Sequence, residues 1–161
     1  MVAAGVAWAG LRFMGTVPEQ EESMPTFSDF EVQSGAARVR LSDFEGEVVV
    51  VYFGYARCPD ICPTTLATVA SAFQALAPDQ LAKVRGLFVS VDPARDLPEH
   101  ARSYAEFFHP QIVGGTSDAE AVAAIAEDWG IRFARADGAS EAMGYTIDHT
   151  SIVYLVAPMD E

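Results

Sequence analysis

The sequence predicts an α/β fold in which helices flank a central mixed β-sheet. Two apolar runs without polar alternation, residues 48–53 and 86–92, are typical of strands buried on both faces. Residues 64–76 lie between them and carry apolar side chains at helical spacing, and Ala77-Pro78 ends this helix. The 161 residues suffice for one domain with a real core and a short extension.

The chain starts with a segment that we expect to lie outside this core. Residues 1–24 hold an apolar run followed by an acidic linker. The run is shorter than the roughly 20 residues that cross a bilayer, and it lacks the basic start of a signal peptide. We weigh a partial membrane anchor equally against a loosely packed terminal segment. Residues 25–161 are expected to form the domain, which opens with a β-hairpin at 27–41.

The second half of the domain continues the alternation of helices and strands. Pro98 is a favourable first helical residue, and the helix that it begins runs to Phe108. Asp118 caps a further helix, for which Gly130 is the stop signal. Apolar stretches at 131–134 and 150–156 predict two more strands.

Charge and motif content argue against several classes of function. The formal net charge is −13 at pH 7, whereas proteins that bind nucleic acid or anionic lipid present clustered Lys and Arg. Neither expected core strand is followed by a GxGxxG or P-loop motif, so dinucleotide-binding and P-loop folds lack support.

The chain has two cysteines, Cys58 and Cys62, in the turn between the first core strand and its helix. A disulfide between them would close a very small loop and stabilise the fold little. We therefore expect the two cysteines to have a chemical role rather than a structural one. The alternative is two buried cysteines that act as small hydrophobes. Reactive cysteines in this turn are typical of the thioredoxin-like fold. The turn is expected to face solvent, and the helix N-terminus favours the thiolate.

Three histidines are candidates for a third functional group. His100 is expected to be a solvated surface residue and His109 a helix-end residue, while His149 is equally well explained as a hydrogen-bonded loop residue. Two thiolates and one imidazole form a soft set that suits Cu(I), whereas zinc ordinarily takes a fourth ligand. Asp92 is a candidate second-shell group or extra oxygen ligand, or simply a turn residue before Pro93.

Three blocks of sequence resemble the Sco/SenC family of copper chaperones for cytochrome c oxidase assembly. The blocks are residues 52–66, which include both cysteines, residues 88–96, and residues 145–151. They lie in the family's order and spacing, and the likeness covers residues 26–161. Together the blocks are far more specific than the spacing of two cysteines.

The resemblance implies a thioredoxin-like domain that binds Cu(I) or Cu(II) through Cys58, Cys62 and His149. It implies delivery to the copper A centre of cytochrome c oxidase, with the copper-bearing subunit or another copper carrier as partner, which is a carrier role rather than catalysis. It also implies an N-terminal membrane anchor, with the site facing the bacterial periplasm or the mitochondrial intermembrane space. Two departures are Leu97, where the family commonly has Thr, and an end at Pro158-Met-Asp-Glu, where relatives continue; we expect a C-terminally truncated domain.

Three other functions remain open. A thiol–disulfide oxidoreductase would use Cys58 and Cys62 as a redox-active dithiol to reduce the cysteines of a copper apo-site. A peroxidase of peroxiredoxin type would require a Thr-x-x-Cys approach to its nucleophile, and Gly54-Tyr-Ala-Arg precedes Cys58 instead. A redox or copper sensor would use the same residues.

Overall fold

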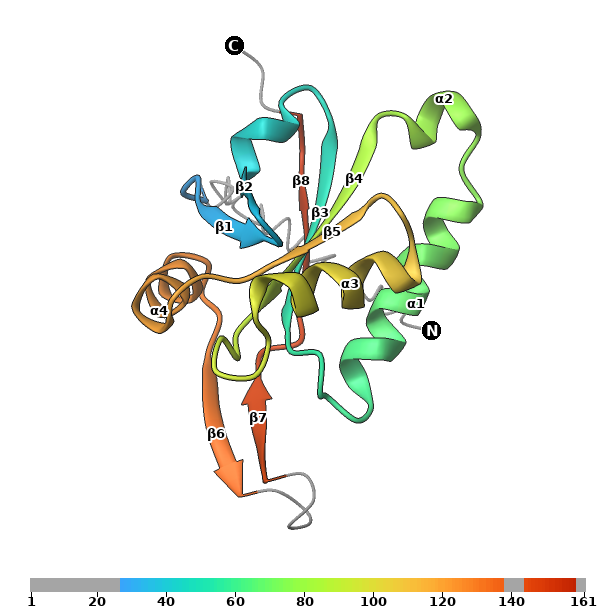
Figure 1. Ribbon diagram of the computed structural model, residues 1–161. Helices are drawn as coiled ribbons and strands as arrows, with labels where there is room; N and C mark the ends of the chain where they lie inside the picture. Colours follow the sequence, from blue (N-terminus) through green and yellow to red (C-terminus); the bar gives the residue numbers. More distant parts are fainter. Residues whose placement is uncertain (1–26, 138–143, 159–161) are drawn as a thin grey trace, which may run out of the picture.

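The computed structural model describes residues 27–137 and 144–158, and a four-stranded mixed sheet lies at its centre (Figure 1). The strands follow the order β5-β4-β3-β8, where β3 is Val48–Gly54, β4 is Val84–Ser90, β5 is Ile112–Gly115 and β8 is Val153–Val156. The first three are parallel, and β8 is antiparallel to β3. The predicted mixed sheet is therefore confirmed.

Helices cover the sheet on both faces. Their bounds are Ile61–Gln74 for α1, Pro78–Leu81 for α2, Pro98–Phe108 for α3 and Ala119–Asp128 for α4, and Leu41–Phe44 form the 3₁₀ turn η1. The β3-α1-β4 and β4-α3-β5 crossovers step along the sheet in one direction, and such crossovers are right-handed. They therefore place α1 and α3 on the same face, where the two helices contact each other.

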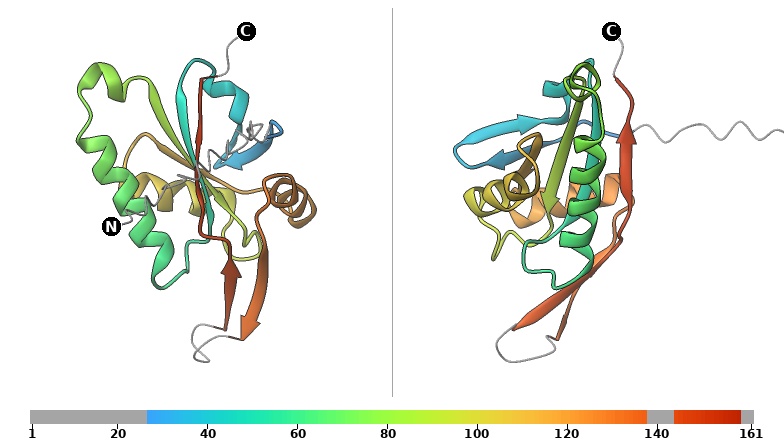
Figure 2. Two further views of the ribbon diagram at one scale, coloured as in Figure 1. Left: turned by 180° about the vertical axis from the view of Figure 1, so that it is seen from behind. Right: turned by 90° about the vertical axis from the view of Figure 1, so that its right-hand side faces the viewer.

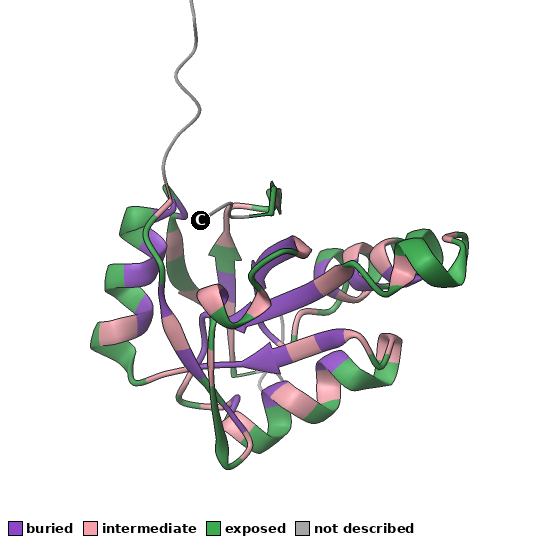
Figure 3. Cartoon of the chain, turned by 90° about the horizontal axis from the view of Figure 1, so that it is seen from above, coloured by how far each residue is buried: buried purple, intermediate pink, exposed green. Residues whose placement is uncertain are grey.

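The buried residues concentrate in the central strands (Figure 3). Along β3, Tyr52 points toward α1 and α3, and its ring lies 6.3 Å from that of Phe88. Phe53 points to the opposite face and packs against Trp129, at the end of α4, with ring centroids 5.7 Å apart. Side chains alternate between the two faces of a strand, so a strand with a helical layer on each side is apolar at every position. This confirms that the apolar run at 48–53 is a strand buried on both faces.

Two further strand pairs form sheets of their own, and the first of them is joined to the end of β5 by backbone hydrogen bonds between Gln33 and Thr116. The predicted N-terminal hairpin is formed by β1 (Glu31–Ser34) and β2 (Ala37–Arg40), and Gly35 takes a positive φ of 59° at its turn. The pair of β6 (Phe133–Asp137) and β7 (Tyr145–His149) projects beyond the sheet in every view (Figures 1 and 2).

Three element predictions were wrong in part. The strand expected at 150–156 is shorter, because β8 covers only Val153–Val156, and the preceding residues Tyr145–His149 form a separate strand, β7, that pairs with β6 and was not predicted. Strand β5 was not predicted, since two of its four residues are glycine and glycine weakens strand patterns. One of them, Gly114, is required by packing: a Cβ there would lie 2.0 Å from Ala101 O in α3. The helix expected from residue 64 begins earlier, at Ile61.

The signals at the helix ends are confirmed. Pro98 is the first residue of α3, and the Asp118 side chain accepts a hydrogen bond from Ala121 N–H at 2.9 Å at the start of α4. No helix among the described residues is long and apolar enough to cross a membrane. The expected N-terminal segment 1–24 and the last three residues of the chain lie outside the described residues.

Candidate metal centre

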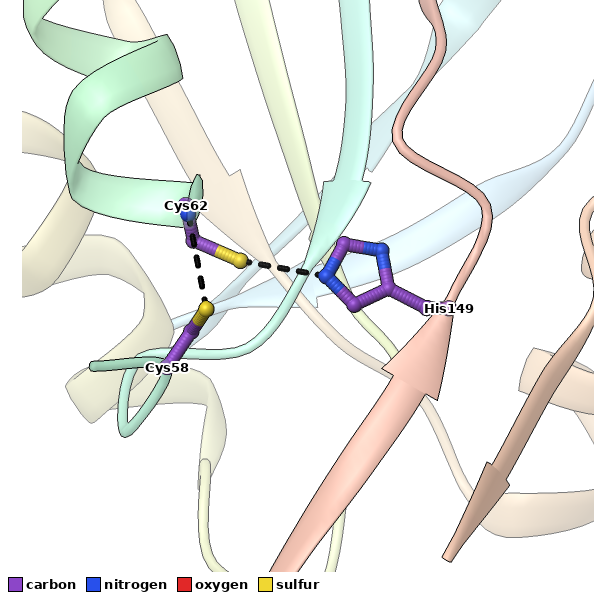
Figure 4. Close-up of side chains that lie close together, drawn as sticks. All are labelled: Cys58, Cys62 and His149. Atoms are coloured by element: carbon purple, nitrogen blue, oxygen red, sulfur yellow. Dashed lines mark hydrogen bonds between the residues drawn. The ribbon is translucent and has the colours of Figure 1, made fainter. Parts of the chain in front are cut away.

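Strand β3 leads into a tight loop that carries Cys58. Gly54 O, at the end of β3, accepts a hydrogen bond from Val91 N–H at 2.8 Å, and Cys58 N–H donates to Tyr55 O at 3.2 Å. Helix α1 then begins and includes Cys62, whose N–H donates to the Cys58 sulfur at 3.4 Å (Figure 4). Cys58 precedes the helix, so the two cysteines do not share one helical face. The curl of the loop brings the two sulfurs together instead.

Cys62 differs from the exposed, thiolate-favouring position that the sequence predicts. Its side chain is 0% exposed, whereas Cys58 is half-buried. Burial raises the pKa of the Cys62 thiol to about 12, so this cysteine keeps its proton at neutral pH. A metal ion that binds there must displace that proton, so metal affinity rises with pH.

His149 lies at the end of β7 and faces the cysteines, with Nε2 3.3 Å from the Cys62 sulfur (Figure 4). Its other ring nitrogen, Nδ1, lies 3.1 Å from the backbone carbonyl of Thr150. A carbonyl oxygen can only accept, so Nδ1 carries the proton and Nε2 presents a lone pair toward the sulfurs. Burial also lowers the pKa of His149, which favours the neutral imidazole that metals bind.

The two sulfurs and one imidazole nitrogen lie within 4.8 Å of one another. Within residues 27–137 and 144–158, no other group of three His, Cys, Asp or Glu ligand atoms lies this close. Two thiolates and an imidazole in a partly buried, three-coordinate arrangement suit a soft ion such as Cu(I) better than zinc. The structure thus brings together the three predicted ligands, which come from a loop, a helix and a strand.

Asp92 lies outside this group of three and has other partners. Its side chain is 1% exposed, pairs with the Arg95 guanidinium, and accepts a hydrogen bond from the Tyr145 hydroxyl at 2.6 Å. Arg95 also donates to Tyr145 O at 2.9 Å. Because Tyr145 begins the strand that ends at His149, this network holds the base of β7. A role for Asp92 in orienting the ligands or supplying an extra oxygen ligand remains a prediction.

The other two histidines lie away from the cysteines, but His100, expected to be a solvated surface residue, is half exposed and contacts a buried carboxylate. His100 Nδ1 lies 3.3 Å from the Asp96 carboxylate, and the His100 side chain is 48% exposed. His109 follows α3, where its ring lies edge-on to Phe73 at 5.4 Å and its Nδ1 accepts from Gln111 N–H at 3.2 Å.

Sequence analysis missed residues that frame the site. Tyr52 and Tyr55 present their rings edge-on to the His149 ring at 6.3 and 5.9 Å, and the Tyr55 hydroxyl accepts from Ile147 N–H in β7 at 3.2 Å. Asp96 accepts from Ala56 N–H in the cysteine loop at 2.7 Å. The sequence places both tyrosines next to the cysteines, and this closeness was the one signal that they could frame the site. Their partners in β7, His149 and Ile147, lie about ninety residues further along the chain.

The burial difference predicts unequal thiol reactivity. In the reduced, metal-free protein at about pH 8, we expect iodoacetamide to modify Cys58 at least about tenfold faster than Cys62, because Cys62 is enclosed and its raised pKa leaves little thiolate. Mass spectrometry of the modified peptides over time measures both rates. In urea the two rates should converge, and equal rates in the folded protein would contradict the burial of Cys62.

Comparisons with known proteins agree on one family. The family model described as SCO1/SenC matches residues 18–161. The mitochondrial SCO2 homologue of Bos taurus is 33% identical over 98% of this chain and 63% of its own length, so this chain spans less than two thirds of that relative. A SCO2-like protein of Rickettsia felis is 29% identical over 88% of this chain and 69% of its own length.

The solved structures that this chain resembles include Sco proteins as well. The apo Sco1 protein of Thermus thermophilus is 38% identical, with a TM-score of 0.75 over 84% of this chain and 78% of that chain. ScoI of Arabidopsis thaliana with copper bound is 28% identical, with a TM-score of 0.74 over 82% of this chain and 81% of that chain. These neighbours confirm the predicted thioredoxin-like fold. With the family match covering most of its length, the chain belongs to the SCO1/SenC family.

Proposed function

We propose that this chain is a copper chaperone that holds Cu(I) or Cu(II) through Cys58, Cys62 and His149. It delivers the ion during assembly of the copper A centre of cytochrome c oxidase. The observation that carries the proposal is the approach of two thiol sulfurs and one unprotonated imidazole nitrogen to within 4.8 Å of one another.

The donor set suits a carrier that must also release its cargo. Two soft thiolates favour Cu(I), and three ligands leave room for a fourth from a partner to enter before a first one leaves. Exchange of this kind requires access. Cys58 is half-buried, and a surface hollow lined by Phe133, Asp148 and His149, among others, opens beside the imidazole.

Relatives with bound copper support the choice of metal. Structures with copper bound exist for ScoI of Arabidopsis thaliana, ScoI of Bradyrhizobium japonicum and yeast Sco1, which are 28%, 27% and 26% identical to this chain. Their TM-scores lie between 0.72 and 0.74.

The proposal also covers where the protein lies in the cell, how its chain is organised and which partner receives the copper. We infer that residues 25–161 are the copper-binding domain and that residues 1–24 contribute to a membrane anchor and linker. The site then faces the bacterial periplasm or the mitochondrial intermembrane space. The recipient is the copper-bearing subunit of cytochrome c oxidase or another copper carrier. The family resemblance and the mitochondrial relatives support this part.

Anaerobic titration of the reduced protein with Cu(I), followed by X-ray absorption, tests the chemistry. We expect about one copper ion per chain, bound by two sulfurs and one nitrogen at about 2.0–2.3 Å, the range of thiolate and imidazole ligands. Saturation with less than half an ion per chain, or a site without nitrogen, would contradict the proposal. Zinc offered under the same conditions should bind more weakly.

A thiol–disulfide oxidoreductase is the second candidate, and one observation favours it. The two thiols are close together and unequal in exposure, with half-buried Cys58 placed to attack a substrate disulfide and enclosed Cys62 placed to resolve the mixed disulfide. In that reaction the substrate disulfide gains two electrons and two protons as Cys58 and Cys62 form a disulfide. Reduction of a disulfide-linked peptide from a copper apo-site measures this activity directly.

A further inference from the structure

A buried carboxylate lies behind the cysteine loop. Asp96 is in the segment between β4 and α3, and its side chain is 0% exposed. Its Oδ2 accepts two hydrogen bonds, from Ala56 N–H in the cysteine loop at 2.7 Å and from the Ser90 hydroxyl at the end of β4 at 2.6 Å. Asp96 therefore joins the loop to an element 40 residues away in the sequence.

The second oxygen of this carboxylate faces α3. Oδ1 is buried, makes no hydrogen bond with the described residues, and lies 3.3 Å from Nδ1 of His100, one helical turn further on. A carboxylate is costly to bury unless donors and a counter-charge offset its lost hydration. Two hydrogen-bond donors on Oδ2 offset part of this cost, and the His100 imidazole lies beside Oδ1. The pair is therefore a specific arrangement and not a solvated surface contact.

Apart from buried Tyr55, whose hydroxyl accepts from Ile147 N–H at 3.2 Å, the cysteine loop has few supports. Cys58 lies before α1, and the hydrogen bond from its N–H to Tyr55 is internal to the loop. Asp60, the N-cap residue of α1, makes no side-chain capping bond. The bond from Ala56 to Asp96 ties the loop to the body of the domain two residues before Cys58.

We propose that Asp96, paired with His100, is a positioning residue that holds the Cys58 sulfur within reach of Cys62 and His149. This inference rests on the proposed copper-binding function and deepens it. A loop that leaves this position separates Cys58 from the other two ligands, which are set by α1 and β7. The apparent copper affinity is then proportional to the fraction of molecules in which the loop holds this position.

Substitutions at Asp96 test the inference through copper affinity and coordination. Asp96→Ala removes the acceptor and should weaken Cu(I) binding about tenfold or more, the result of losing a buried hydrogen bond to a charged group. X-ray absorption should report fewer than two sulfurs per copper. Asp96→Asn keeps a carbonyl oxygen that can face Ala56 and Ser90, so it should retain most of the affinity and both sulfurs. His100→Ala should cause a smaller loss, about threefold, because the imidazole is half exposed.

A matched control separates positioning from general stability. Gln111 donates a hydrogen bond to Leu81 O at 2.9 Å, at the end of the sheet opposite the cysteine loop. Gln111→Ala should lower the melting temperature and leave copper affinity and coordination unchanged. If Asp96→Ala does not fold, His100→Ala decides, and unchanged affinity there overturns the role of the pair.

The outcomes distinguish this inference from the function on which it rests. A wild-type chain that fails to bind copper through two sulfurs and a nitrogen overturns the proposed function. A wild-type chain that binds in this way, together with a folded Asp96→Ala chain of the same affinity and sulfur count, overturns the positioning role alone.

Discussion

Replacing His149 with alanine should weaken Cu(I) binding at least about a hundredfold, since loss of even an outer-shell partner costs ten- to a hundredfold. His149 supplies the nitrogen ligand, and its Nε2 already points at the Cys62 sulfur from 3.3 Å. The two thiols do not depend on it, so their capacity for disulfide exchange should remain. Competition with a chromophoric Cu(I) chelator measures the affinity, and reduction of a disulfide-linked peptide measures the exchange.

The matched control for this substitution is His109→Ala. His109 is also partly buried and contacts an aromatic ring, but it lies after α3 and outside the group of three ligands. It should leave copper affinity unchanged. Full affinity in His149→Ala would show that the three-ligand site is wrong. Loss of peptide reduction with copper binding intact would favour the oxidoreductase over the chaperone.

The layered fold could be predicted because its strongest signals are local. Continuous apolar runs mark β3 and β4, and Pro98 and Asp118 mark the starts of two helices. The missed features depend on tertiary contacts. Strand β5 contains Gly114 because Ala101 of α3 packs against it, and no pattern within β5 itself reports that contact.

The candidate site was predictable in composition but not in its electrostatics. The cysteine pair is visible as a short spacing, whereas His149 lies 87 residues from Cys62 and was selected by the family blocks and not by spacing. The burial of Cys62 follows from the start of α1 at Ile61 and from the rings around it, which a single sequence does not reveal. Asp96 was missed for the same reason, because its partner Ala56 belongs to another segment.

Adding one methyl group at Gly54 should impair both folding and copper binding. A Cβ at Gly54 would lie 2.8 Å from the Cys62 sulfur and 3.2 Å from atoms of the Tyr52 and Phe88 rings. All three neighbours are at most 1% exposed, so no open space can take up the displacement. We expect Gly54→Ala to lower the free energy of unfolding by about 2 kcal/mol, as overpacking of cores does. We also expect it to weaken Cu(I) binding by about tenfold, because the sulfur that moves is a ligand.

Gly86→Ala separates these two effects. A Cβ at Gly86, in the neighbouring strand β4, would lie 2.9 Å from the Ile112 side chain, which is equally tight packing away from the site. Denaturant unfolding should report a similar loss of stability for both variants, whereas chelator competition should report weaker copper binding for Gly54→Ala alone. If both variants bind copper equally well, the sulfur of Cys62 tolerates displacement. The close packing at Gly54 would then serve the core and not the metal centre.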